Sequence, residues 1–120
     1  MATILVIDDE DTIRALLSTV LRSAGHDVVE ASNGRQGVAL FRQRPVDLAI
    51  VDLLMPELNG LDTIIELTRQ CLDVKVIAIT GLGGDESMVN TAKLLGARQT
   101  LCKPFEIQEL LGTVRYELSH

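Results

Sequence analysis

Five polar residues with complementary chemistry each follow a short apolar run of the chain. They are three carboxylates, a hydroxyl and an ammonium: Asp8, Asp9, Asp52, Thr80 and Lys103. Carboxylate oxygens suit Mg²⁺, which accepts one or two carboxylates and keeps water positions for a phosphate group. A carboxylate can also attack a phosphoryl group and form an acyl phosphate. If these side chains meet in the fold, they predict phosphoryl chemistry at a metal site.

Each residue then has a role that fits its charge. Asp8 and Asp9 would hold the cation, Mg²⁺ or Mn²⁺, while Asp52 would be both a metal ligand and the nucleophile. The cation and Lys103 would neutralise charge on the transferred oxygens, and Thr80 would hydrogen-bond one of those oxygens.

The apolar runs before these residues predict the strands that position them. The runs are continuous rather than alternating, which indicates burial on both faces, as in a parallel sheet. We predict strands at residues 4–7, 28–31, 48–51, 74–79 and 99–102, with amphipathic helical patterns between them and after the last. This is a single doubly wound (βα)5 α/β sandwich of the flavodoxin-like type, residues 1–120, with strand order 2-1-3-4-5. Ligands of such folds bind beyond the carboxyl ends of the strands, where all five polar residues should converge.

The composition narrows the function classes. The chain has 120 residues, 47% of them hydrophobic, so it can bury a core; its net charge of −6 argues against direct nucleic-acid binding. No apolar run is long enough to span a membrane, and no signal peptide precedes the first predicted strand, so we expect a cytoplasmic location. Cys71 and Cys102 lack metal-type spacing and are interpreted as reduced packing residues.

The motifs around these residues resemble those of the response-regulator receiver domains of two-component signalling, the CheY-like superfamily. The matching pieces are "LVIDDE", "VDLLMPELNG", "AITG", "LGA" and "LCKPF", in this order over essentially the whole chain. The resemblance implies that Asp52 is the phosphoacceptor, that Asp8 and Asp9 are the acidic pair, and that Thr80 is the switch hydroxyl. It also implies that Lys103 contacts the phosphate, that the Leu54 carbonyl ligates the metal, and that the peptide bond before Pro104 is cis.

The resemblance further implies a signalling switch rather than a turnover enzyme. A sensor histidine kinase or a histidine phosphotransferase would supply the phosphoryl group. Phosphorylation would alter the face formed by the fourth helix, fifth strand and fifth helix. This change would control a partner protein, an output domain or a homodimer that binds there. We expect a mixed-charge surface there, with residues Lys93, Arg98, Glu109, Arg115 and Glu117.

Three positions depart from the family pattern. Thr100 stands where receiver domains usually have the Tyr or Phe that reads out the switch hydroxyl. Leu54 and Leu82, two residues after Asp52 and Thr80, are apolar at variable positions beside the phosphate. We therefore expect a different readout of Thr80.

Two other classes share parts of this pattern. Phosphatases of the haloacid-dehalogenase type also use a strand-end Asp, Mg²⁺, a Thr or Ser and a Lys, but they usually carry an acid where this chain has Leu54. Flavodoxin-like electron carriers need a hydroxyl-rich and glycine-rich phosphate loop after the first strand and aromatic residues over the flavin. This chain has acids at that loop and only one Tyr, two Phe and no Trp.

Overall fold

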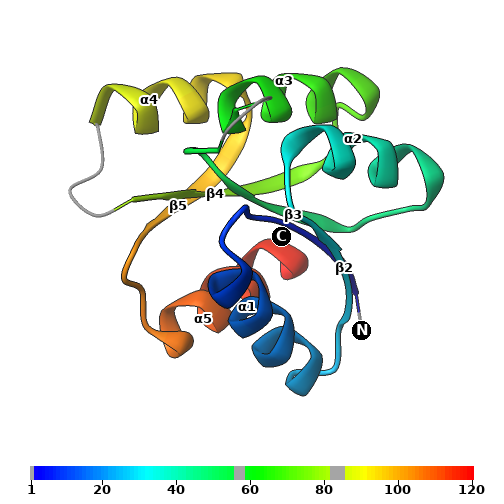
Figure 1. Cartoon of the computed structure of the whole chain (residues 1–120), viewed down its shortest axis with the longest axis vertical. Coiled ribbons are helices and arrows are strands. Elements are labelled where there is room, and N and C mark those ends of the chain that lie inside the picture. Colours follow the sequence, from blue (N-terminus) through cyan, green and yellow to red (C-terminus); the bar gives the residue numbers. More distant parts are fainter. Residues whose placement is uncertain (1, 56–58, 82–85) are drawn as a thin grey trace.

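A computed structural model describes residues 2–55, 59–81 and 86–120 of the chain (Figure 1). Its elements, in order, are β1 (Thr3–Ile7), α1 (Asp11–Ser23), β2 (Asp27–Ala31), α2 (Gly34–Gln43), β3 (Leu48–Asp52), α3 (Gly60–Gln70), β4 (Lys75–Thr80), α4 (Glu86–Leu95), β5 (Ala97–Cys102) and α5 (Ile107–Ser119). The prediction of five βα units is confirmed, and every strand bound lies within two residues of its predicted position.

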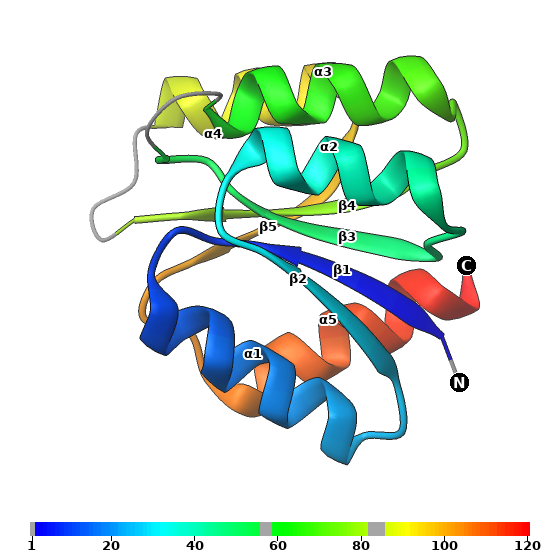
Figure 2. The same cartoon turned by 45° about the vertical axis from the view of Figure 1, so that its right-hand side comes forward.

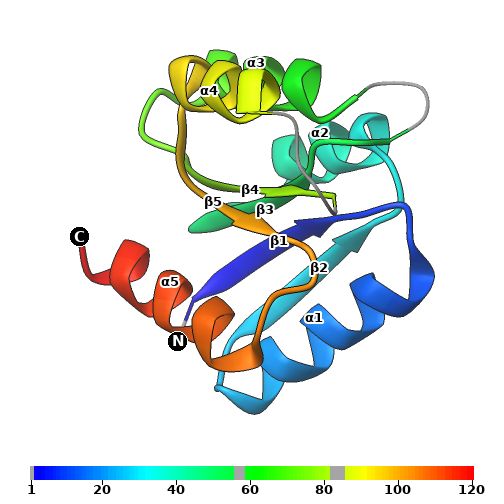
Figure 3. The same cartoon turned by 90° about the vertical axis from the view of Figure 1, so that its left-hand side faces the viewer.

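The five strands form one parallel sheet in the order β2-β1-β3-β4-β5, as predicted. Helices α2, α3 and α4 cover one face of the sheet, and α1 and α5 cover the other (Figures 1 and 2). Figure 3 shows the same two layers of helices from another side. Because the strands are parallel, their carboxyl ends share one edge of the sheet.

The core lies on both faces of the sheet, which explains the continuous apolar runs. Along β1, Leu5 and Ile7 pack in the cluster beneath α2, α3 and α4, whereas Ile4 and Val6 pack in the cluster beneath α1 and α5. All four side chains are fully buried. Burying one such side chain contributes roughly 1.5–3 kcal/mol, so this alternation fixes the strand between the two helix layers.

Two further predictions concern the cysteines and membrane-spanning segments. The interpretation of Cys71 and Cys102 as packing residues is wrong, because both are exposed, with free thiols. Cys71 follows the end of α3, and Cys102 is the last residue of the edge strand β5. Within the described ranges, the helices are too short or too polar for any of them to cross a membrane.

Candidate functional site at the carboxyl edge of the sheet

Backbone pairing places Asp8, Asp52 and Lys103 at the same edge of the sheet. Asp52 is the last residue of β3, and β3 lies beside β1. Asp8 directly follows β1, and its N–H donates to the Ala31 carbonyl at 3.1 Å, which continues the pairing of β1 with β2. The Lys103 N–H donates to the Thr80 carbonyl at 2.9 Å, so the backbone of Lys103 continues the pairing of β4 with β5.

Gly60 holds the segment after Asp52 against the start of α3. Its N–H donates to the Leu53 carbonyl at 3.2 Å. A Cβ at this position would lie 2.3 Å from the Asp52 carbonyl oxygen and 2.4 Å from the Leu53 Cα. Only glycine allows so close an approach of two backbone segments, and this approach fixes where the Asp52 side chain begins.

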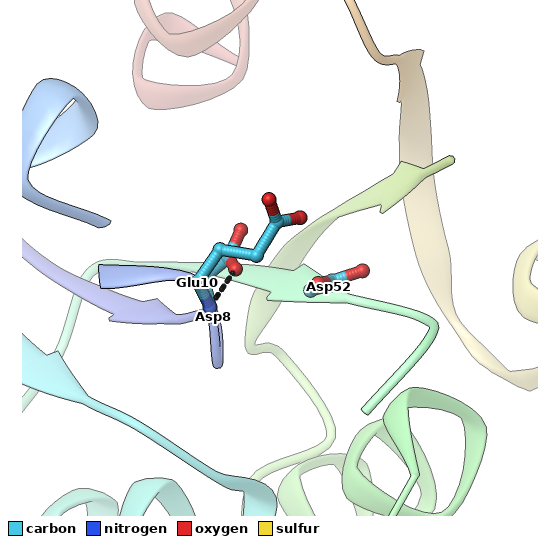
Figure 4. A group of neighbouring side chains, drawn as sticks. All are labelled: Asp8, Glu10 and Asp52. Carbon is cyan, nitrogen blue, oxygen red and sulfur yellow. Dashed lines mark hydrogen bonds between the residues drawn. The ribbon is translucent and has the colours of Figure 1, made fainter. Parts of the chain in front are cut away.

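Three carboxylates meet at this edge (Figure 4). One oxygen from each of Asp8, Glu10 and Asp52 lies within 4.8 Å of the other two. Asp8 and Asp52 are only 1% and 3% exposed, whereas the Glu10 side chain is 54% exposed. Backbone N–H groups hold the two buried acids: Glu10 N donates to Asp8 Oδ1 at 2.8 Å, and Leu54 N donates to Asp52 Oδ1 at 3.1 Å.

Lys103 is the cation of the cluster. Its Nζ lies 2.6 Å from Glu10 Oε1 and 3.4 Å from both Asp8 Oδ2 and Asp52 Oδ2. One ammonium thus faces three carboxylates, and the site keeps an excess of negative charge. Such an excess in a buried place favours a cation or protonation.

The two buried acids, Asp8 and Asp52, both have raised pKa values. Burial, supported by the charge of Asp8, raises the pKa of Asp52 from 3.8 to about 6, against the lowering effects of the Leu54 N–H and Lys103. Burial also raises the pKa of Asp8. Burial alone would lower the pKa of Lys103, but its hydrogen bond to Glu10 and the charges of Asp52, Asp8 and Glu10 outweigh that and raise it.

The raised pKa of Asp52 predicts a pH-dependent stability. Between about pH 4 and pH 6 the folded state binds a proton at Asp52 that the unfolded state has lost, so stability falls as the pH rises. The loss is roughly 1.4 kcal/mol for each pKa unit of the shift. Asp52→Asn should remove this component. Denaturant unfolding in EDTA at pH 4 to 7, followed by circular dichroism, should show the variant gaining stability over the wild type as the pH rises. A difference that does not change with pH would contradict the shift.

The donor set fits a divalent cation. Asp8 Oδ2 is buried and accepts no hydrogen bond, although Lys103 lies 3.4 Å away as an ion pair. A buried oxygen without a hydrogen bond is costly unless another group meets it. Carboxylate oxygens that converge on one place are ligands that Mg²⁺ accepts.

The structure brings together most, but not all, of the predicted site residues. Asp8, Asp52 and Lys103 are in contact. Asp9 is exposed and is not among the three carboxylates that lie within 4.8 Å of one another, so its role as a metal ligand stays a prediction. Thr80 is buried, and its hydroxyl donates to the Leu101 carbonyl at 3.5 Å, a long contact.

The remaining predictions concern the rim of the site. The Lys103-Pro104 bond is cis, as the resemblance implied. The Leu54 side chain is 59% exposed and reaches toward the end of β4, since a Cβ on Gly81 would lie 3.5 Å from its Cδ1. The role of the Leu54 carbonyl as a metal ligand stays a prediction, and Leu82 lies outside the described residues.

Glu10 is the site residue that sequence reasoning missed. Its signal was its place in the acidic run, directly after the predicted pair. In the structure Glu10 Oε1 accepts a hydrogen bond from Lys103 Nζ at 2.6 Å, whereas the neighbouring Asp9 is exposed and not among the three converging carboxylates.

The face formed by α4, β5 and α5 differs from the expected mixed-charge surface at one residue. Lys93, Arg98, Glu109 and Arg115 are exposed, but Glu117 is only 4% exposed. Glu117 is buried because it faces β5: Gln99 Nε2 donates to Glu117 Oε2 at 2.7 Å, and Arg98 lies 3.8 Å from Glu117 Oε1. Thr100 is half-buried beside Ala78 of β4, without an aromatic ring.

The family of this fold and site is clear from comparison with known proteins. A family model described as "Response regulator receiver domain" matches residues 4–115. The chain therefore belongs to the receiver domains of two-component response regulators.

Relatives and solved structures agree with this family. Protein PilH of Pseudomonas aeruginosa is 37% identical over 121 residues, covering 99% of this chain and 99% of PilH. Chemotaxis protein CheY of Thermotoga maritima is 34% identical over 104 residues, covering 86% of each chain. The crystal structure of a putative response regulator from Chloroflexus aurantiacus has a TM-score of 0.92 at 31% identity, covering 99% of this chain and 98% of the other.

Some relatives are longer proteins. The probable transcriptional regulator ycf27 of Porphyridium aerugineum is 39% identical over 112 residues, which is 93% of this chain but 46% of that protein. The chain thus spans about half the length of such relatives. None of these findings supports the alternative of a haloacid-dehalogenase-type phosphatase.

Proposed function

We propose that this domain is a phospho-accepting switch in which Asp52 takes a phosphoryl group from a phosphohistidine donor. The observation that supports this most strongly is the buried Asp52 carboxylate at the end of β3, beside Asp8 and within 3.4 Å of the Lys103 ammonium. A nucleophile, an acidic pocket and a cation thus lie in one place.

The transfer makes one bond and breaks one bond. An oxygen of the Asp52 carboxylate attacks phosphorus, the bond between phosphorus and the donor histidine nitrogen breaks, and that nitrogen keeps the electron pair. The attacking group must be ionised. A pKa of about 6 leaves Asp52 mainly as the carboxylate at pH 7. The Lys103 ammonium lies close enough to Asp52 to form an ion pair with the oxygens of the transferred phosphoryl group. The Thr80 hydroxyl would give up its long hydrogen bond to the Leu101 carbonyl and donate to a phosphoryl oxygen instead.

Asp8 and Asp52 would hold the metal, with Asp9 and the Leu54 carbonyl as further ligands. When bound, Mg²⁺ or Mn²⁺ would supply positive charge that stabilises the transferred phosphoryl oxygens. The orphaned Asp8 Oδ2 is the feature of this chain that such a cation would satisfy.

The receiver-domain family to which the chain belongs suggests its partners. The donor would be a sensor histidine kinase or a histidine phosphotransferase, both in the cytoplasm. The target would be a partner protein or an output domain, reached through α4, β5 and α5, or a second copy bound there. Residues 1–120 act as one domain that modifies itself rather than as a turnover enzyme, and its charge of −6 disfavours nucleic acid as a direct target.

The function is tested by incubation with acetyl phosphate, a small phosphoryl donor, and Mg²⁺. The intact mass should increase by one phosphoryl group, and mild alkali should remove it, since acyl phosphates are labile in alkali. No uptake from acetyl phosphate or from a phosphohistidine protein would contradict the proposal.

The residue at position 54 predicts how long the phosphoryl group survives. Hydrolysis needs a water in line behind phosphorus, and Leu54 cannot position it by a hydrogen bond. We expect slow loss of phosphate, and about tenfold faster loss in Leu54→Asn, a change of ~1.4 kcal/mol in the barrier. Leu82→Glu tests the second apolar position in the same way. The measurement is decay of the phosphorylated mass after the donor is removed. Rapid wild-type decay that neither substitution alters would contradict the argument.

A further inference from the structure

Glu10 makes the shortest contact with Lys103 although it is the most exposed of the three acids. The distance from Lys103 Nζ is 2.6 Å to Glu10 Oε1, against 3.4 Å to each buried carboxylate. The Glu10 side chain is 54% exposed, whereas the Lys103 side chain is 15% exposed. Lys103 is therefore held mainly by a group that can move away into water.

Glu10 and a phosphoryl group on Asp52 would compete for this ammonium. Lys103 Nζ donates to Glu10 Oε1 at 2.6 Å and to Asp52 Oδ2 at 3.4 Å, whereas Asp8 Oδ2 lies 3.4 Å away as an ion pair without a hydrogen bond. The shorter bond holds the ammonium toward Glu10 rather than toward the carboxylate that would carry the phosphoryl group. Lys103 therefore has to shift from Glu10 toward Asp52 to hold the phosphoryl oxygens closely.

Glu10 is the contact that is easiest to give up. The side chains of Asp8 and Asp52 are short and buried, and each accepts a hydrogen bond from a backbone N–H. Glu10 has a longer side chain at the surface, and its carboxylate can be rehydrated at little cost. It also repels incoming negative charge, because its carboxylate lies within 4.8 Å of an Asp52 oxygen.

We propose that Glu10 is a displaceable counter-ion that holds Lys103 in the unphosphorylated state and competes with the phosphoryl group for it. This inference rests on the proposed function and adds a regulatory residue to its site. Glu10 is a positioning residue in this account, since it acts through Lys103. Its effect is to keep the domain from binding phosphoryl-like anions too readily.

The test is titration with beryllofluoride, a tetrahedral analogue of the phosphoryl group, at saturating Mg²⁺, followed by NMR. Glu10→Gln should bind beryllofluoride about threefold to fivefold more tightly than the wild type, the range expected from loss of an exposed ion pair. Asp11→Asn is the matched control, because it removes an equal charge one residue away from a side chain that is 89% exposed. It should change the affinity little. The Lys103 side-chain resonances should shift in the Glu10→Gln protein before beryllofluoride is added.

A double-mutant cycle separates release of Lys103 from simple repulsion. In a Lys103→Met background, Glu10→Gln should lose most of its gain. An equal gain in both backgrounds, or no gain over Asp11→Asn, would overturn the inference. Weaker binding of both Mg²⁺ and beryllofluoride by Glu10→Gln would also overturn it, because Glu10 would then be a metal ligand. Absence of any beryllofluoride binding by the wild type would instead overturn the proposed function, and the inference with it.

Discussion

Asp52→Asn abolishes phosphoryl uptake from acetyl phosphate in the presence of Mg²⁺; this is the largest effect we expect of any substitution in the chain. The amide cannot form the acyl phosphate, so the covalent step is lost rather than slowed. The fold should survive, because Asn removes a carboxylate charge that is costly to bury; this burial, with the nearby charge of Asp8, raises the pKa of Asp52 to about 6. Intact mass after incubation measures the uptake, and circular dichroism measures the folded fraction.

Asp62→Asn is a suitable control for this loss. Asp62 is an exposed acid in the first turn of α3 and is not among the three carboxylates that lie within 4.8 Å of one another. It should take up phosphate like the wild type. Lys103→Met should give an intermediate result, because the nucleophile stays while the ammonium that faces it is lost. Undiminished uptake by a folded Asp52→Asn protein would show that the acceptor is another residue.

Mg²⁺ raises the melting temperature of the domain by several degrees over EDTA; this is the second large effect that we expect. The apo site crowds three carboxylates around one ammonium, and a bound cation relieves their repulsion and satisfies Asp8 Oδ2. At about 100 times its dissociation constant, a ligand stabilises the folded state by roughly 2.7 kcal/mol. The chain has no Trp, so circular dichroism or a dye must follow the melts.

Substitutions identify the ligands behind this shift. Asp8→Asn should abolish most of it, because Asp8 supplies the buried oxygen without a hydrogen bond. Asp9→Asn should reduce it if the acidic pair implied by the family resemblance holds the metal, whereas Glu10→Gln should leave most of it in place. Identical melts in Mg²⁺ and EDTA for the wild type would remove the metal from this account.

The fold was predictable because its signals are local and repeated. The continuous run in β1 marks a strand buried on both faces, and the structure buries Ile4, Leu5, Val6 and Ile7 completely. A parallel sheet then brings the carboxyl ends of its strands to one edge, which is why the sequence predicts that Asp8, Asp52 and Lys103 meet, as they do in the structure.

The details that the sequence missed depend on side-chain direction rather than on pattern. Asp9 and Glu10 are adjacent acids after the same predicted strand, and nothing in the sequence shows which side chain turns toward Lys103. In the structure Asp9 is exposed and Glu10 contacts Lys103. Glu117 looked like a surface acid, but its helix faces β5 and Gln99 satisfies its carboxylate in the interior. Cys102 was interpreted as a packing residue because the two cysteines lack metal-type spacing, yet it is the exposed last residue of an edge strand.

The most direct test of the central claim locates the phosphoryl group itself. Phosphorylated protein is treated with borohydride, which reduces an aspartyl phosphate to homoserine, and is then digested and sequenced by mass spectrometry. Our account predicts homoserine at position 52, only in samples that received both the phosphoryl donor and Mg²⁺. Unmodified Asp52 together with a stable phosphate on a Ser, Thr or His of the wild-type chain would contradict it.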